Sequence, residues 1–262
     1  MARSQAVRVA VMRAAGTNCD CETAYAFEKA GATADRLHVN RLAEKPALLS
    51  EYHILALPGG FSYGDDVASG KVLANEIRSR LEEPMRLFIS KGKPVIGICN
   101  GFQVLVKAGL LPGLAPCVQA SLTGNDSARF EARWVHLKAE ESVCIFVKPG
   151  DDMYLPVAHG EGKFVADPKT LAALDKKRLV VMRYATPEGA VCSEYPGNPN
   201  GSVNGIAGIC DATGRIFGLM PHPERHVEPT QHPRWTREGL QPEGDGMKVF
   251  RNAVEFVRRE LL

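Results

Sequence analysis

One short stretch, residues 93–103, constrains the fold of this chain more than any other part of its sequence. It begins with an apolar and largely β-branched segment, residues 95–98, which has the length of a buried strand. Cys99 follows between Gly97 and Gly101 in the pattern Gly-x-Cys-x-Gly, the nucleophile-elbow pattern with cysteine in place of serine. We therefore predict a strand, a tight turn and a helix, with the thiol at the carboxyl end of the strand.

The residues around Cys99 favour a reactive thiol over an inert one. A cysteine among apolar residues is often a plain core residue, but two flanking glycines let the strand and the helix approach closely around a strained turn. The free N–H groups and the positive dipole end of the following helix favour the thiolate. The pattern names no substrate, so the chain must also supply a base, an orienting carboxylate and an oxyanion hole.

The first half of the chain alternates predicted strands with predicted helices. This indicates an α/β fold with an open, largely parallel sheet and helices on both faces. The expected strands cover residues 7–12, 34–39, 54–57 and 94–98, and the expected helices cover residues 20–30, 73–91 and 100–109. Ligands of such sheets bind at the carboxyl ends of the strands, where both Gly60 and Cys99 fall.

The second half of the chain predicts added β-hairpins. Two strands are expected within residues 130–146, with a turn near residues 140–142, and a hairpin is expected from residues 205–210 and 216–220. Further strands are expected at residues 156–159 and 180–184, and helices at residues 169–174 and 247–261. Residues 228–245 are polar and rich in proline, which predicts a surface insertion. Since no linker divides the sequence, we expect a single domain over residues 1–262.

Composition and charge exclude several classes of function. The chain is 45% hydrophobic and 24% charged, as is usual for globular proteins, and its net charge of +2 gives no reason to expect a nucleic acid or an acidic membrane as partner. The apolar runs are strand-sized and the N-terminus lacks a signal-peptide core, so we expect no membrane span and a cytoplasmic location. Seven scattered cysteines argue against a disulfide framework.

A candidate base and a candidate orienting carboxylate follow the strand predicted at residues 216–220. His222 and Glu224 stand in the sequence Pro-His-Pro-Glu, where the carboxylate can fold back towards the imidazole. A histidine after a strand is often structural, but the elbow elsewhere in the chain favours a catalytic pair. The oxyanion hole needs two N–H donors: Asn100 supplies one, and Gly60 or Phe61 can supply the other.

Three other candidate motifs are rejected because their spacing is wrong or because a required residue is missing. Residues 64–71 resemble a phosphate-binding loop, but the spacing of their glycines is wrong and Val72 replaces the required Ser or Thr. The sequence from His222 to Glu224 matches the His-x-Glu of zinc deaminases, but no Pro-Cys-x-x-Cys follows. His222, Glu224, His226 and His232 fit no helical metal-binding spacing. We therefore expect no metal ligands among these residues.

Taken together, residues 97–103 and 221–224 resemble the class I (triad) glutamine amidotransferases, which have a flavodoxin-like α/β fold. More narrowly, the chain resembles the glutaminase subunits of phosphoribosylformylglycinamidine synthase, an enzyme of purine biosynthesis, in residues 16–20, 58–66, 156–162 and 220–225. The Gly-Gly-Phe-Ser-Tyr-Gly-Asp and His-Gly-Glu-Gly stretches are the most specific, and the resemblance covers nearly the whole chain. Residues 119–129 and 228–245 look longer than in compact members of the family, which concerns the partner-facing surface rather than the triad.

The resemblance implies a mechanism and a role for each motif residue. Cys99 attacks the side-chain amide of glutamine, His222 moves the protons and Glu224 holds the imidazole. The N–H groups of Gly60 and Asn100 stabilise the oxyanion. The residues that hold glutamine are expected to be Phe61, Gln103, His159 and Gly160.

In this family the ammonia goes to a separate synthetase subunit, which uses ATP to convert formylglycinamide ribonucleotide to the amidine, and a small third subunit often bridges the two. We therefore expect no cofactor in this chain, with ATP and magnesium on the partner. One alternative is an independent cysteine hydrolase of γ-glutamyl compounds or peptides on the same fold. A non-catalytic scaffold is the other alternative, and it has no use for an intact Cys99, His222 and Glu224.

Overall fold

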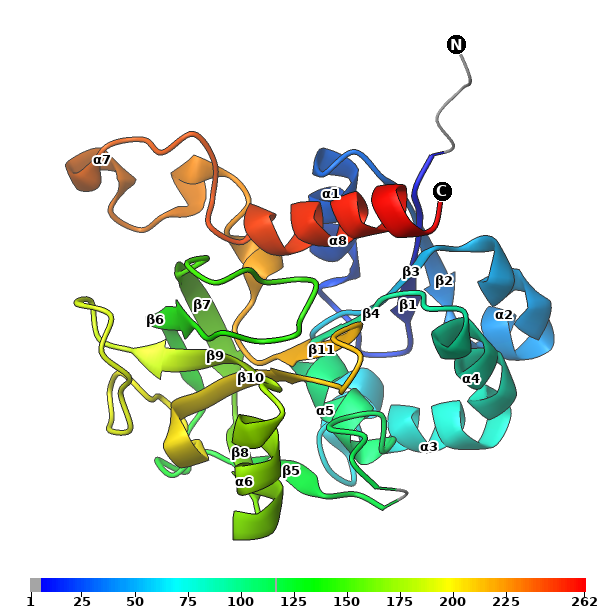
Figure 1. Ribbon diagram of the computed structural model, residues 1–262, viewed down its shortest axis with the longest axis horizontal. Coiled ribbons are helices and arrows are strands. Elements are labelled where there is room, and N and C mark those ends of the chain that lie inside the picture. Colours follow the sequence, from blue (N-terminus) through cyan, green and yellow to red (C-terminus); the bar gives the residue numbers. More distant parts are fainter. Residues whose placement is uncertain (1–5, 116) are drawn as a thin grey trace.

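The computed structural model describes residues 6–115 and 117–262 (Figure 1). Its centre is a nine-stranded sheet with the order β2-β1-β3-β4-β11-β10-β9-β6-β7. The first five strands pair in parallel: β2 (Thr33–His38), β1 (Arg8–Arg13), β3 (Ile54–Leu57), β4 (Val95–Ile98) and β11 (Ile216–Leu219). The other four pair antiparallel: β10 (Ile206–Cys210), β9 (Val180–Ala185), β6 (Glu131–Ala139) and β7 (Met153–His159). The predicted α/β class is confirmed, and the pairing changes from parallel to antiparallel between β11 and β10, one strand beyond the strand β4 that precedes the elbow.

Helices cover both faces of the parallel half, as parallel strands that are buried on both sides require. The helices of this half are α1 (Asp20–Lys29), α2 (Val39–Glu44), α3 (Lys71–Arg80), α4 (Glu82–Ser90), α5 (Asn100–Lys107) and α8 (Met247–Glu260). Helices α1 and α8 pack together on one face, where the Phe27 and Phe250 rings meet edge to face at 4.9 Å. Helices α3 and α5 lie on the other face (Figure 1).

The single helix predicted for residues 73–91 is wrong in one respect, because two helices occupy this range. Helices α3 and α4 meet at Leu81, whose φ of −124° and ψ of 9° are not helical. Pro84 explains the break: it has no N–H to donate to the carbonyl of Arg80, and its ring clashes with that carbonyl.

The hairpin predicted around residues 140–142 is also wrong. Strand β6 ends at Ala139 and pairs with β7 instead, so residues 140–152 form an irregular connection. The backbone of this connection bonds to several elements in turn, since Glu140 N donates to Val181 O at 2.9 Å and Ile145 N donates to Gly214 O at 3.0 Å. The apolar residues that suggested a strand serve the core, where the Phe146 ring stacks on Phe217 at 5.6 Å.

Several short elements were not predicted from the sequence, although the helix expected at residues 169–174 is present as α6 (Pro168–Lys176). A separate two-stranded antiparallel sheet consists of β5 (Ala120–Gly124) and β8 (Glu161–Ala166). The other unpredicted elements are the helices α2 and α7 (Trp235–Glu238) and the 3-10 turns η1 (Pro46–Glu51), η2 (Ser62–Asp65), η3 (Val203–Gly205), η4 (Pro223–Arg225) and η5 (Pro229–Gln231). These elements are too short to be recognised from the sequence, because one or two turns show little periodicity in their apolar residues.

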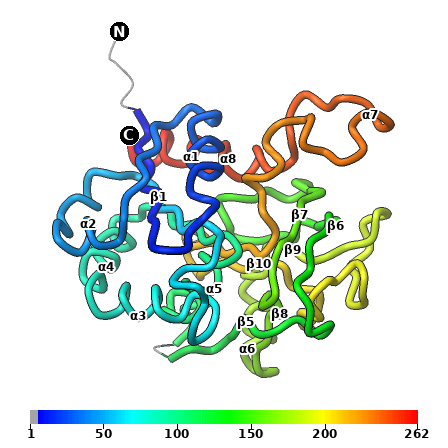
Figure 2. Tube along the Cα trace, turned by 180° about the vertical axis from the view of Figure 1, so that it is seen from behind, coloured from blue at the N-terminus to red at the C-terminus, as the bar shows by residue number. Residues whose placement is uncertain are grey.

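Residues 228–245 project from the edge of the molecule at the end opposite α2, as Figures 1 and 2 both show. Most of these residues are exposed, and they include η5 and α7. The end of the segment is tied to the body, since Tyr154 N donates to Asp245 Oδ2 at 2.9 Å and Gly244 N donates to Val227 O at 3.1 Å. Within the described ranges, no helix has the length and apolarity that crossing a bilayer demands.

Candidate active site

Cys99 sits in a strained turn between β4 and α5. Its φ of 50° and ψ of −105° are unusual for a residue with a side chain, and it is buried in the core. A methyl group at Gly101 would lie 1.9 Å from Leu57 O, and one at Gly97 would lie 2.5 Å from Gly101 O. Both glycines are therefore required by space, as the elbow pattern predicts.

His222 and Glu224 leave β11 at the same edge of the sheet. Strand β11 runs parallel to β4, with Leu219 beside Ile98, so the two chain segments emerge together. His222 Nδ1 lies 2.6 Å from Glu224 Oε1, and both side chains are buried. The other ring nitrogen of His222 has no hydrogen-bond partner in the described part of the chain. The imidazole is thus oriented by the carboxylate, with Nε2 left for a reacting group.

The environment of His222 stabilises the imidazolium. Burial lowers the pKa of His222, but the carboxylate of Glu224 and the sulfur atoms of Cys99 and Cys19 raise it, and the balance is a pKa well above the usual 6.5. A protonated base next to a thiol favours the ion pair of thiolate and imidazolium. This state suits a nucleophile that must attack and a base that must then protonate a leaving amine.

Gly59 lets three side chains meet. A methyl group there would lie 2.7 Å from His222 Cε1, 3.2 Å from Cys19 Sγ and 3.4 Å from Cys99 Cβ. Cys19 was not predicted as a site residue, although it follows β1 at another carboxyl end of the sheet. Its sulfur accepts from Arg225 Nη2 at 3.1 Å, and burial raises the pKa of its thiol.

Replacing Gly59 with alanine should lower the turnover of glutamine, the substrate that the resemblance implies, by about 100-fold. The new methyl group displaces the buried His222 ring, and a misplacement of about 1 Å has this cost. Steady-state kinetics and thermal unfolding measure the two effects separately. The control is Gly124→Ala, since a methyl group at Gly124 meets nothing within 4 Å. Equal activity of the two variants would contradict this account of the site.

Two backbone N–H groups point to an oxyanion hole beside the thiol. Phe61 N donates to Gly16 O at 2.9 Å, which leaves Gly60 as the donor in this turn. The N–H groups of Gly60 and Asn100 have no acceptor among the described residues. Gly60 has a φ of 139°, and a methyl group there would lie 2.7 Å from Asn18 N. The turn therefore needs glycine at this position.

The structure places Gln103 and His159 in the wall of the site with their polar groups already engaged. Gln103 Oε1 accepts from Asn100 Nδ2 at 3.0 Å, and Gln103 Nε2 donates to Glu161 O. His159 Nδ1 lies 3.1 Å from Asn125 Oδ1. Both side chains therefore bind other groups of the protein, and His159 directly follows Ala158, whose carbonyl oxygen lies 3.8 Å from Cys99 Sγ.

His159 belongs to a buried polar network that the sequence did not reveal. Asn200 Nδ2 lies 3.5 Å from His159 Nε2 and donates to Gly162 O at 2.8 Å, and Ser202 Oγ donates to Asn200 Oδ1 at 2.7 Å. Burial, followed by the charge of His222, lowers the pKa of His159 to about 4. His159 is therefore neutral in the folded protein near pH 7.

The low pKa of His159 predicts a loss of stability in acid. In the unfolded chain the imidazole titrates near 6.5, so the unfolded state binds the proton first as the pH falls. The free energy of unfolding should drop by roughly 2 kcal/mol between about pH 7 and about pH 5 through this residue. Urea unfolding at both pH values measures the drop, and His159→Gln should reduce it. A drop unchanged by the substitution would contradict the neutral His159.

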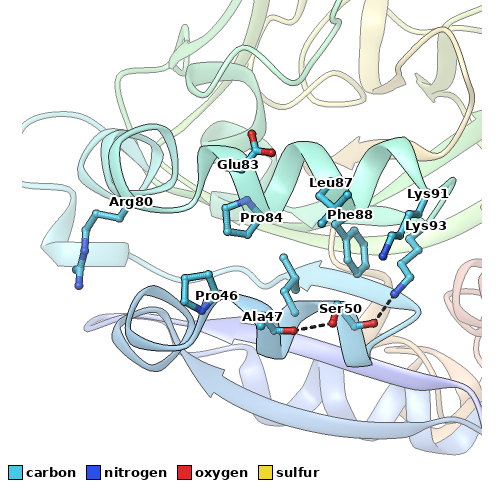
Figure 3. Close-up of a pocket in the computed structure, with 11 residues that line it drawn as sticks. Pro46, Ala47, Ser50, Arg80, Glu83, Pro84, Leu87, Phe88, Lys91 and Lys93 are labelled. Atoms are coloured by element: carbon cyan, nitrogen blue, oxygen red, sulfur yellow. Dashed lines mark hydrogen bonds between the residues drawn. The ribbon is translucent and has the colours of Figure 1, made fainter.

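Phe61 and Gly160, which directly follow Gly60 and His159, are both exposed. The Phe61 side chain is 44% exposed, and its ring centroid lies 6.4 Å from that of Phe130. Gly160 is exposed in the turn between β7 and β8, and its carbonyl accepts from Asn125 N at 2.9 Å. A separate pocket of about 380 Å³ lies between η1 and α4 (Figure 3), and no triad residue lines it.

The geometry agrees with comparisons to known proteins. The profile of the CobB/CobQ-like glutamine amidotransferase domain matches residues 6–257. A protein of Dehalococcoides mccartyi named phosphoribosylformylglycinamidine synthase subunit PurQ is 50% identical over 255 residues, which cover 97% of this chain and 98% of that protein. The chain belongs to the PurQ family of glutamine amidotransferases.

Solved structures support the same assignment. A chain in a structure of PurLQS from Thermotoga maritima is 31% identical, with a TM-score of 0.73 over 97% of this chain and 100% of that one. A glutamine amidotransferase of the same organism, 18% identical with a TM-score of 0.54 over 98% and 99% of the two chains, shares the fold. The PurQ family thus places this chain among enzymes that act on glutamine.

Proposed function

We propose that this chain is the glutaminase subunit of a phosphoribosylformylglycinamidine synthase, which hydrolyses glutamine to glutamate and ammonia for purine biosynthesis. The observation that carries the proposal is the strained Cys99 beside a buried imidazole, whose Nδ1 lies 2.6 Å from the Glu224 carboxylate. The names of the relatives supply the biosynthetic context.

In the first half-reaction the Cys99 thiolate attacks the side-chain carbonyl carbon of glutamine. The N–H groups of Gly60 and Asn100 hold the oxyanion that forms. The imidazolium of His222 donates its Nε2 proton to the amine as the carbon–nitrogen bond breaks, which releases ammonia and leaves a glutamyl thioester.

In the second half-reaction His222, now neutral, removes a proton from water. The resulting hydroxide attacks the thioester, and the same two N–H groups hold the second oxyanion. Collapse of this intermediate releases glutamate and restores the thiolate and the imidazolium. Glu224 keeps Nδ1 protonated throughout, so that Nε2 stays directed at the substrate.

Four residues complete the proposed glutamine site. Phe61 offers an exposed ring at its mouth, and Gly160 offers a turn in which no side chain blocks approach. Gln103 and His159 act from the wall, since their side chains hold Asn100 and the turn between β7 and β8 in position.

The ammonia is proposed to pass to an ATP-dependent synthetase subunit, which converts formylglycinamide ribonucleotide to the amidine and carries ATP and magnesium itself. The name PurLQS of the Thermotoga maritima protein supports partner subunits, and a small bridging subunit is part of this proposal. We also propose that residues 1–262 form one glutamine amidotransferase domain in the cytoplasm, with residues 228–245 as an insertion.

Glutamine hydrolysis by the purified chain, alone and with its synthetase partner, formylglycinamide ribonucleotide and ATP, tests the proposal. We expect weak turnover alone and strong turnover in the complex. Full activity of the isolated chain that the partner does not change would instead favour an independent hydrolase of γ-glutamyl compounds.

A further inference from the structure

A carboxylate next to the proposed oxyanion hole has no part in the mechanism described above. Asp65 lies in the loop of residues 61–70, between β3 and α3, and its two oxygens accept three hydrogen bonds. Oδ1 accepts from Asn100 Nδ2 at 3.2 Å and from Gly70 N at 3.1 Å, while Oδ2 accepts from Ser69 Oγ at 2.9 Å. One side chain therefore joins this loop to the N-terminus of α3 and to the first residue of α5.

The same contacts connect the two proposed oxyanion donors. Asn100 supplies one donor from its backbone, and its side-chain Oδ1 accepts from Ser62 N at 3.3 Å. Ser62 stands two residues after Gly60, which supplies the other donor. The other end of the Asn100 side chain is fixed as well, since Nδ2 donates to Asp65 Oδ1 at 3.2 Å and to Gln103 Oε1 at 3.0 Å. The relative position of the two donors therefore depends on this side chain and its partners.

The loop needs an anchor because its backbone is strained. Tyr63, Gly64 and Asp65 have consecutive positive φ values of 57°, 70° and 55°, which glycine adopts readily and residues with a side chain seldom adopt. Such strain persists only where the surrounding contacts hold it in place. Tyr63 N donates to Ala15 O at 2.7 Å and fixes the start of the strained segment, and the carboxylate of Asp65 fixes its end.

The negative charge of Asp65 does not account for its place beside the oxyanion hole. A carboxylate repels an oxyanion, so the charge by itself would slow the reaction. Lys107, whose Nζ donates to Ser69 O at 2.5 Å, places a positive charge in the same region and opposes this repulsion. What favours the reaction is the geometry of the hydrogen bonds that the carboxylate accepts.

We propose that Asp65 is a positioning residue, which holds the N–H groups of Gly60 and Asn100 at the separation that the oxyanion requires. It acts through Asn100 and makes no hydrogen bond to a triad residue in the part of the chain that the structure describes. Donors that are fixed in advance contribute strongly to catalysis, so a loosened loop costs activity although every reacting atom remains. This role rests on the proposed glutaminase function.

The substitution Asp65→Ala tests the role in the full chain with its synthetase partner. Both half-reactions form an oxyanion, so kcat for glutamine hydrolysis should fall by on the order of 100-fold while KM stays within about threefold. Alkylation of Cys99 by iodoacetamide forms no oxyanion, so its rate should stay within about twofold of the wild-type rate. Mass spectrometry of the Cys99 peptide measures this rate. An equal fall in both rates would show damage to the triad and would overturn the proposal.

Two further variants separate geometry from charge. Asp65→Asn removes the charge but keeps an oxygen that accepts from Asn100 and Gly70, so kcat should stay within roughly tenfold of the wild-type value. Asp65→Glu keeps the charge but displaces the acceptor oxygens by one methylene group, so it should lose more activity than Asp65→Asn. The reverse order would assign the effect to charge and would overturn the proposal, whether or not Asp65→Ala folds.

The matched control is Asp66→Ala, which removes the exposed neighbouring carboxylate and should change kcat by less than about twofold. Circular dichroism and thermal unfolding establish which variants are folded. A 100-fold loss in Asp66→Ala as well would overturn the specific role of Asp65.

The proposed function and the role of Asp65 fail separately. If the wild-type chain with its partner hydrolyses no glutamine, the proposed function is overturned. If the wild type hydrolyses glutamine and folded Asp65→Ala keeps its full kcat, only the role of Asp65 is overturned.

Discussion

Replacing Cys99 with alanine should reduce glutamine-dependent synthesis by the complete complex by at least about 10⁴-fold, while synthesis from added ammonia stays within about twofold. The thiol forms the only covalent bond to the substrate in the proposed mechanism, so no other group can replace it. The synthetase reaction itself does not involve Cys99. Steady-state rates of amidine formation with glutamine and with an ammonium salt measure both effects.

The fold should tolerate this substitution, because alanine keeps the Cβ atom and removes only a sulfur. Cys21→Ala is the control, since its side chain is exposed and lies outside the triad. Loss of both glutamine-dependent and ammonia-dependent synthesis in Cys99→Ala would show that the two reactions are not divided between subunits.

Replacing Glu224 with glutamine should lower kcat by roughly 10²- to 10⁴-fold and leave KM little changed. The neutral amide no longer stabilises the imidazolium of His222, and it can reverse the hydrogen bond at Nδ1, which now spans 2.6 Å. The pKa of His222 should therefore fall towards the value that burial favours. The dependence of kcat/KM on pH reports this fall.

Glu22 offers a matched control for Glu224. Its carboxylate lies 3.1 Å from Arg225 Nε, close to the site but without contact to the imidazole. Glu22→Gln should change kcat by no more than a few-fold, because the partly exposed pair contributes little. A similar loss of kcat in both variants would show that Glu224 contributes only a negative charge near the site and does not act by orienting and stabilising the His222 imidazolium.

The elbow was the part of the site that the sequence predicted best. A methyl group at Gly97 would meet Gly101 O of the same turn, so a local pattern can record this glycine. Gly101 belongs to the same pattern, although the group that it faces is Leu57 O of the neighbouring strand β3. Cys19, Asn125 and Asn200 were missed for the opposite reason. They reach the site from segments far apart in the chain, and no local spacing marks their meeting.

The secondary structure shows the same difference between elements that the local sequence determines and segments that contacts with distant residues determine. The amphipathic helix α8 agrees closely with its prediction because its apolar spacing is contained within its own turns. Residues 140–152 were predicted as part of a hairpin because Phe146 and its neighbours are apolar. Their backbone partners, such as Val181 and Gly214, belong to strands and turns that only the folded chain brings close.

The pairing of β4 with β11 also determines when the thiol becomes reactive. Cys99 is synthesised well before His222, and its own N–H is bonded to Leu219 O of β11 at 2.8 Å. Until the ribosome has released β11 and that strand has docked, the cysteine has neither its base nor its fixed backbone. The nascent chain therefore carries an ordinary thiol, and closure of the sheet activates it.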